Sequence, residues 1–200
     1  MNRFGARFKY SKFQKIVDDS NISITSNITT VVMRRDLEPV LNSFTEYEIC
    51  YGNRFHVKSE LGYNIKSSGF KVGGISDIVY LSDRPNTDLK TGSIFLFKLN
   101  SPTEPVILKQ SIGTIDYVKG EIKLNPINII STVVNRTIPL IEISISPYSN
   151  DVIGYQDLYL QLDSSNSIVS TISDNISSGN DISGTNYIVS SSYTNGSLTR

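Results

Sequence analysis

The chain has few side chains that can carry out nucleophilic or metal chemistry. Its single histidine is His56 and its single cysteine is Cys50. A Cys/His pair needs both side chains within hydrogen-bond reach, and the turn residues Gly52 and Asn53 between them disfavour one continuous strand. We therefore interpret Cys50 as a small buried hydrophobe. One histidine and one cysteine cannot supply the four ligands of a zinc site, and the Gly-x-Ser-x-Gly motif of serine hydrolases does not occur.

Paired carboxylates offer another route to hydrolysis, because two of them can act as acid and base without a histidine. Asp77, Asp83 and Asp88 are close in sequence, but Asp83 and Asp88 stand in turn contexts, where Asp is favoured for conformational reasons. No spacing singles out a pair. The sequence therefore predicts no catalytic, metal-binding or cofactor-binding residue, and a hydrolase that uses Asp77 or Asp83 is the weakest alternative. We expect a protein that is not an enzyme and needs no cofactor.

The composition limits the partners of the chain. Of its 200 residues, 19 are basic and 19 are acidic, so no general attraction to nucleic acid or to an anionic membrane is expected. The longest apolar runs, such as residues 93–97, are too short to span a bilayer. The 38% hydrophobic content can form the core of one domain of ordinary size. These features leave protein as the expected class of partner, with no nucleic acid and no membrane.

Period-two patterns predict that most elements are short strands. Residues 94–99 begin apolar on both faces, which is typical of a central strand covered on two sides. Residues 82–86 contain Asp, Pro and Asn and are expected to form a loop. The predicted fold class is α+β, predominantly β, with an antiparallel, sandwich-like domain, a short N-terminal helix and an extended C-terminal arm. Further strands are predicted at residues 46–51, 75–81, 106–109, 140–145 and 158–162.

The sequence of residues 115–124 predicts a β-hairpin with its turn at Lys119 and Gly120. A two-residue turn at these positions gives one apolar face and one charged face. The alternative is a type I turn at Val118 and Lys119 with Gly120 in the left-handed region, which suits the lysine better but is expected to move Ile122 and Leu124 off the apolar face. We prefer the two-residue turn. It pairs Val118 with Glu121, Tyr117 with Ile122, Asp116 with Lys123 and Ile115 with Leu124.

The N-terminal residues combine a helix signal with a strand signal. Ser11 and Gln14 have the spacing of a capping box, and the apolar residues behind them follow helical spacing, which predicts a helix over residues 12–19. Over residues 22–33 the pattern has period two and predicts strands. The charged run Arg-Arg-Asp at residues 34–36 is interpreted as a solvated strand end, with a partner-binding patch as the less favoured alternative.

The same patterns divide the chain into three parts. Residues 1–40 hold the helix and strands, which cannot bury much by themselves. They either dock on the residues that follow or, as we expect, belong to a larger body that is missing from this chain. Residues 41–163 form the β-rich domain. Residues 164–200 are rich in Ser, Asn and Thr and poor in apolar residues, which is typical of a flexible tail or of an arm that orders against another subunit. Within this arm, residues 187–193 could add one strand.

Several stretches resemble a known family. Phe-Gly-Ala-Arg-Phe-Lys-Tyr-Ser-Lys at residues 4–12 and Asn-Ile-Thr-Thr-Val-Val-Met-Arg-Arg-Asp at residues 27–36 resemble the C-terminal region of the large baseplate wedge subunit of T-even-like contractile-tailed phages. That subunit is related to the baseplate J-like family. Its members are several times longer, so the resemblance covers a C-terminal portion, and we expect the part that bundles with the other wedge protein to be missing. Further similar stretches are residues 82–85, 114–122, 148–152 and 187–193.

The resemblance implies a structural subunit of a phage tail baseplate wedge. Members of the family self-associate, dock neighbouring baseplate proteins and form the inner ring around the tail hub. The implied partners are a second copy, giving a homodimer, and other wedge, hub or sheath-initiating proteins, in the virion tail and in the host cytoplasm during assembly. The alternative is a carbohydrate- or receptor-binding β-module of a phage tail whose tyrosines contact the ligand. The candidate interface residues are Arg34, Arg35, Tyr187, Ile188, Val189 and Tyr193.

Overall fold

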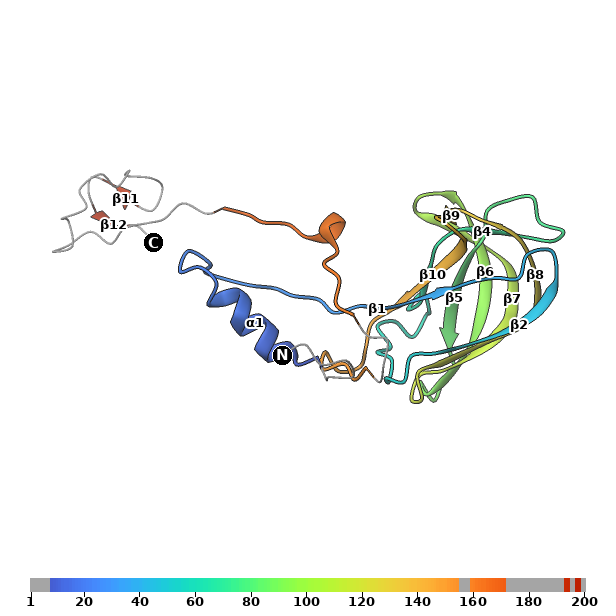
Figure 1. Ribbon diagram of the computed structural model, residues 1–200, viewed down its shortest axis with the longest axis horizontal. Coiled ribbons are helices and arrows are strands. Elements are labelled where there is room, and N and C mark those ends of the chain that lie inside the picture. The colour runs from blue at the N-terminus through green and yellow to red at the C-terminus, as the bar shows by residue number, and fades with distance from the viewer. Residues whose placement is uncertain (1–7, 155–158, 172–192, 195–196, 199–200) are drawn as a thin grey trace. The chain divides into compact units, whose positions relative to one another are not determined.

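The computed structural model describes residues 8–154, 159–171, 193–194 and 197–198 (Figure 1). The chain divides into two units, Met1–Leu158 and Tyr159–Arg200. The first unit holds two antiparallel β-sheets and the helix α1 (Tyr10–Asp18). None of the helices in the described ranges is long and apolar enough to cross a membrane. In the second unit the described elements are the 3-10 turn η1 (Ser164–Asn166) and the paired strands β11 (Tyr193–Thr194) and β12 (Ser197–Leu198).

The larger sheet has six strands in the order β2-β8-β7-β6-β5, and β4 also pairs with β8. Ile94, Phe95 and Leu96 in β6 are at most 1% exposed, so this strand is covered on both faces. The prediction of a central strand at residues 94–99 is confirmed. The bounds are β2 (Phe44–Cys50), β4 (Phe70–Val72), β5 (Tyr80–Pro85), β6 (Thr91–Ser101), β7 (Glu104–Asp116) and β8 (Glu121–Thr132).

The smaller sheet is built around β10, which pairs with β1, β3 and β9. Ile141, Ile143 and Ile145 in β10 are at most 2% exposed and share one face, as their alternation with Glu142 and Ser144 predicts. The edge strand β1 takes residues 33–37 of the expected N-terminal part into this sheet. The bounds are β1 (Met33–Leu37), β3 (Lys66–Ser67), β9 (Val134–Asn135) and β10 (Pro139–Ile145).

The two sheets enclose one hydrophobic core. Its buried members come from both, with Ile143 in the smaller sheet and Leu96 and Ile122 in the larger one. A polar contact adds to this core, because the buried hydroxyl of Tyr51, the residue after β2, donates to the carbonyl oxygen of Ile143 in β10 at 2.7 Å. The predicted class, α+β with β predominant, is confirmed.

The hairpin at residues 115–124 is present, but the preferred register is wrong. Ile115 pairs with Ile122 and Asp116 with Glu121, which leaves residues 117–120 as a four-residue turn. The carboxylate of Asp116 accepts the N–H groups of Val118 and Lys119 at 3.0 and 2.9 Å, and Gly120 takes the positive φ of +75°. Lysine therefore avoids the left-handed region, which costs a non-glycine residue about 1–2 kcal/mol. Ile122 and Leu124 stay buried, contrary to the expectation for a shifted register.

The helix near the N-terminus is confirmed, but its predicted cap is wrong. α1 starts two residues earlier, with Lys9 at the N-cap position, no side-chain cap, and Ser11 inside the helix. The N–H of Tyr10 instead donates to the Asp151 carboxylate at 2.8 Å. A carboxylate at this helix end satisfies an unpaired donor and complements the macrodipole.

The strand prediction for residues 22–33 is wrong except at its last residue. Residues 21–32, here called the connecting segment, form no strand and run from the end of α1 to β1 (Figure 1). The pattern of alternating β-branched residues exists, but a strand also needs a partner strand, and the described chain supplies none.

The predicted loop at residues 82–86 is also wrong, because residues 80–85 form β5 and Asp83 is fully buried. Residues 75–78 precede that strand, contrary to the predicted strand at 75–81. The strand predicted at residues 158–162 is absent from its described part. Leu160 and Leu162 are 64% and 74% exposed there, so no packed face stabilises a strand.

Candidate functional site

The two arginines of the predicted interface lie on opposite faces of β1. Arg34 forms ion pairs with Asp36 at 3.1 Å and with Glu142 of β10 at 3.5 Å. Glu142 also accepts from Arg136 at 2.9 Å. Arg34 is thus held within a charged surface network of its own sheet. Its surroundings fit the solvated strand end that the sequence favours.

The other candidate interface residues lie in the second unit. Residues 187–189, which carry three of the candidates, lie outside the described residues. Tyr193 belongs to β11, where it pairs with Leu198 of β12. Tyr193 and the two arginines thus belong to different units of the chain.

Arg35 lines a groove between β1 and β2, the edge strands of the two sheets. We call it the edge groove. Its charged walls carry one arginine against three carboxylates, so its surface is acidic. The lining residues are Arg35, Asp36, Leu37, Glu38, Glu48, Ile49 and Cys50.

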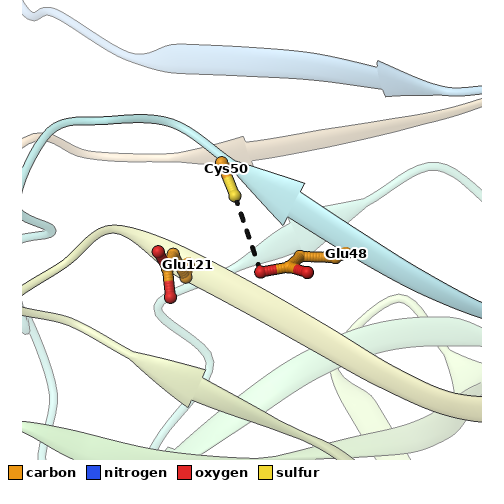
Figure 2. A group of neighbouring side chains, drawn as sticks. All are labelled: Glu48, Cys50 and Glu121. Carbon is orange, nitrogen blue, oxygen red and sulfur yellow. Dashed lines mark hydrogen bonds between the residues drawn. The ribbon is translucent and has the colours of Figure 1, made fainter.

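Cys50 is exposed on β2, so the prediction of a buried cysteine is wrong. Side chains alternate along a strand, and here Ile49 points into the core while Cys50 points out. Figure 2 shows Cys50 and Glu48 on β2 beside Glu121, the cross-strand neighbour of Cys50 on β8. Their potential ligand atoms lie within 4.8 Å of one another, an arrangement that could hold a metal ion in principle.

The electrostatics of this group do not favour metal binding. Partial burial, followed by the neighbouring Glu48, raises the pKa of the Cys50 thiol, and metals bind the thiolate. The Glu48 carboxylate is already paired with Lys123 at 3.2 Å. That hydrogen bond raises the pKa of the Lys123 ammonium. We interpret the group as cross-strand pairing at an exposed sheet edge.

A second groove lies at the hairpin end of the larger sheet, where its lining mixes threonines, carboxylates and two lysines. No aromatic side chain lines it, nor does one line the edge groove. Neither groove therefore offers the aromatic platform expected of a site that binds sugar rings through tyrosines. The lining residues are Asn86, Thr91, Gly92, Thr114, Ile115, Asp116, Lys119, Glu121 and Lys123.

The most buried charged group is Asp83, which the sequence placed in a turn. Its carboxylate accepts the Ile65 N–H at 2.7 Å, the Asn64 amide at 2.9 Å and a very short hydrogen bond from the Tyr117 hydroxyl. Burial and then the Asp83 charge raise the pKa of Tyr117. Asp83 is 0% exposed, so no substrate reaches it. We assign the group to fastening residues 64–65 and the hairpin turn onto β5.

Several strongly exposed apolar residues of the first unit lie before the sheets begin. Ile16 of α1 is 59% exposed, and in the connecting segment Ile22, Ile28 and Val32 are 99%, 95% and 54% exposed. The described residues of α1 include none that is buried. Exposed apolar residues in this number and proximity are typical of proteins that assemble with others.

The comparisons with known proteins concern these same residues. Residues 1–36 match the family described as baseplate structural protein gp6, C-terminal domain III. The match covers 36 of the 200 residues, which include α1, the connecting segment and the start of β1. Over this part the chain is similar to a structural protein of a phage baseplate. Neither the curated proteins nor the solved structures contain a match to the chain.

Proposed function

We propose that this protein is a structural subunit of a phage tail baseplate, and specifically of a baseplate wedge. The family match over residues 1–36 carries the proposal. It falls on the segment whose apolar side chains are exposed and therefore available to a neighbouring subunit. The coarser role, a structural component of a baseplate, follows from the described family, and the wedge assignment rests on the further resemblance of residues 4–12 and 27–36.

In this role the protein self-associates and docks other wedge, hub or sheath-initiating proteins to form the inner ring around the tail hub. It acts without catalysis or a cofactor, first in the host cytoplasm and then in the tail of the virion. The exposed apolar residues of the first unit support this role. So does the second unit, where residues 159–171 are all exposed and include Leu162, Ile168 and Val169.

The alternative, a carbohydrate- or receptor-binding module, receives less support. Several aromatic rings pack against one another, as Tyr63 does with Phe95 and Phe97 at 5.2 and 5.4 Å between ring centroids. The exposed ring of Tyr148 lies under the Arg54 guanidinium at 4.1 Å. Binding to a glycan array that is lost on Tyr148→Ala would favour this alternative.

The decisive test removes the protein from the phage that encodes it. A stop codon early in the reading frame should leave infected cells with tail parts but without complete baseplates, as seen by electron microscopy. Expression of the intact chain in the host should restore particles. Tails with complete baseplates and normal infectivity in its absence would refute the proposal.

A further inference from the structure

The connecting segment has the side-chain pattern of a strand whose partner is missing. Over residues 27–32 the side chains alternate between half-buried and exposed positions. Ile28, Thr30 and Val32 lie on the exposed side. This period of two is that of an extended chain. Eight of the twelve residues from 21 to 32 are β-branched, as strands favour.

Within the part of the chain that the structure describes, no residue hydrogen-bonds to the backbone groups of Ile28 or Thr30, so one edge of this segment is unpaired there. The carbonyl oxygen of Thr29 accepts the Tyr10 hydroxyl at 2.6 Å, so the backbone groups of Thr29 face α1. In an extended chain the N–H and C=O groups of successive residues point to opposite sides. The backbone groups of Ile28 and Thr30 therefore face away from α1, toward solvent.

Charge distinguishes this segment from the other strand edges. The edge strand β1 carries Arg34, Arg35 and Asp36, and the edge strand β2 carries Glu46 and Glu48. Such charges protect a sheet edge against pairing with another chain. Residues 21–32 contain no charged residue and no proline, so this edge lacks that protection.

We propose that residues 25–32 of the connecting segment pair as an antiparallel strand with the same residues of a second copy of this chain. Self-pairing suits an uncharged segment, because no register opposes like charges. A register that places even-numbered residues opposite one another brings Ile28, Thr30 and Val32 of both copies onto one face. The inference rests on the proposed baseplate role only in naming a second copy as the partner.

The pairing is weak for an isolated dimer. The Ile24 N–H closes a turn on the Asn21 carbonyl oxygen at 3.0 Å, so residues 25–32 are the part that can be extended. Eight residues at about 3.3 Å each give a ribbon roughly 26 Å long. A single strand contact of this length buries less than the ~800 Å² per partner of a stable interface. The dissociation constant is therefore expected in the micromolar range or weaker, with further contacts in an assembled ring adding to it through multivalency.

The test is sedimentation velocity on the full chain at concentrations up to about 1 mM. The wild type should pass from monomer to dimer. Thr30→Pro removes the N–H of residue 30 from the unpaired edge. In a two-fold symmetric dimer this removes one hydrogen bond from each copy, so the dissociation constant should rise at least about tenfold. Ile28→Lys introduces the missing edge charge and should act the same way. Thr29→Pro is the matched control, since its N–H faces α1, and its dimerisation should stay close to that of the wild type.

Amide hydrogen exchange at low and high protein concentration gives the second readout. The amide of Thr30 should exchange more slowly at high concentration, and that of Thr29 should not change. A wild type that stays monomeric would overturn the inference, as would a dimer that Thr30→Pro and Ile28→Lys leave intact. Either result leaves the baseplate role standing if particle assembly still requires the protein.

Discussion

Replacing Asp83 by asparagine exchanges one buried oxygen for an amino group and should destabilise the first unit strongly. The carboxylate oxygens accept from Ile65, Asn64 and Tyr117. If the new side chain keeps its oxygen toward the Ile65 N–H, its amino group faces the amino group of Asn64. Asn64 cannot rotate to accept, because its own oxygen already accepts the N–H groups of Lys58 and Ser59 at 2.7 and 2.8 Å. Two buried donors are then left facing each other.

The cost follows from the lost bond and the unpaired donor. A hydrogen bond to a charged group contributes about 1.5–3 kcal/mol, and a buried donor without a partner costs about 1–3 kcal/mol. The Tyr117 hydroxyl can turn to accept from the new amino group, which recovers part of the loss. We expect Asp83→Asn to lower the free energy of unfolding by about 2–4 kcal/mol, a large part of the stability of an ordinary domain.

Urea unfolding followed by far-ultraviolet circular dichroism measures this change, since the chain has no tryptophan. With a slope of about 2 kcal/mol per molar urea, the midpoint should fall by about 1–2 M. Asp88→Asn is the matched control, because exposed Asp88 accepts the N–H groups of Lys90 and Thr91 and asparagine can still accept them. A midpoint shift for Asp83→Asn no larger than that of the control would refute the reasoning.

Two further predictions concern alkaline pH and the hairpin turn. Burial raises the pKa values of Tyr51 and Tyr117, so their stabilising effect is complete below the ordinary value of about 10 and is lost as the pH rises above it, by up to about 1.4 kcal/mol per pH unit for each. Urea midpoints at about pH 8 and pH 11 should therefore differ, and Tyr117→Phe should reduce the difference; a pH-independent midpoint would contradict this. Gly120→Ala should lower the free energy of unfolding by about 3 kcal/mol or more, because φ is +75° and the new Cβ would lie 2.1 Å from the carbonyl oxygen of Asn53. Gly74→Ala, at a φ of +82° with no atom within 4 Å, should cost only about 1 kcal/mol, and equal urea midpoints for the two variants would argue against the steric account.

The strands of the core were predictable because their signal is local. Residues 94–96 of β6 are apolar in succession, which indicates a strand that is buried on both faces. Residues 140–145 of β10 alternate between apolar and polar, which indicates burial on one face. The hairpin shows the limit of prediction from neighbouring residues. Its location follows from the sequence, but its register depends on Asp116 capping the turn and on Asn53 packing against Gly120, and the apolar pattern tolerates both registers.

Contacts between distant residues were not predictable. The start of α1 depends on Asp151, which is 141 residues away from Tyr10. Asp83 looks like a turn residue beside Arg84 and Pro85, and only its three hydrogen-bond donors from elsewhere allow a carboxylate in a strand interior. Local propensity is a weak prior wherever such partners exist.

The candidate site was predictable only in part. The sequence predicts that residues 1–40 cannot bury much alone, and Ile22 and Ile28 of the connecting segment are exposed. The charged run at residues 34–36 made Arg34 and Arg35 candidate interface residues, yet Arg34 forms ion pairs with Asp36 and Glu142 of its own sheet. The more informative signal was the absence of charge from residues 21–32, a run of β-branched residues without any residue that protects an edge.

The attachment of β1 has a consequence for synthesis on the ribosome. Met33 pairs with Ile145, more than 100 residues later in the chain. At a translation rate of about 5–20 residues per second, roughly 5–20 s pass between the two emerging. Residues 33–37 can therefore join the smaller sheet only after nearly the whole β domain has been made. A chain that is cut short before β10 has no strand to anchor its N-terminal segment, so only finished domains present that segment to a growing assembly.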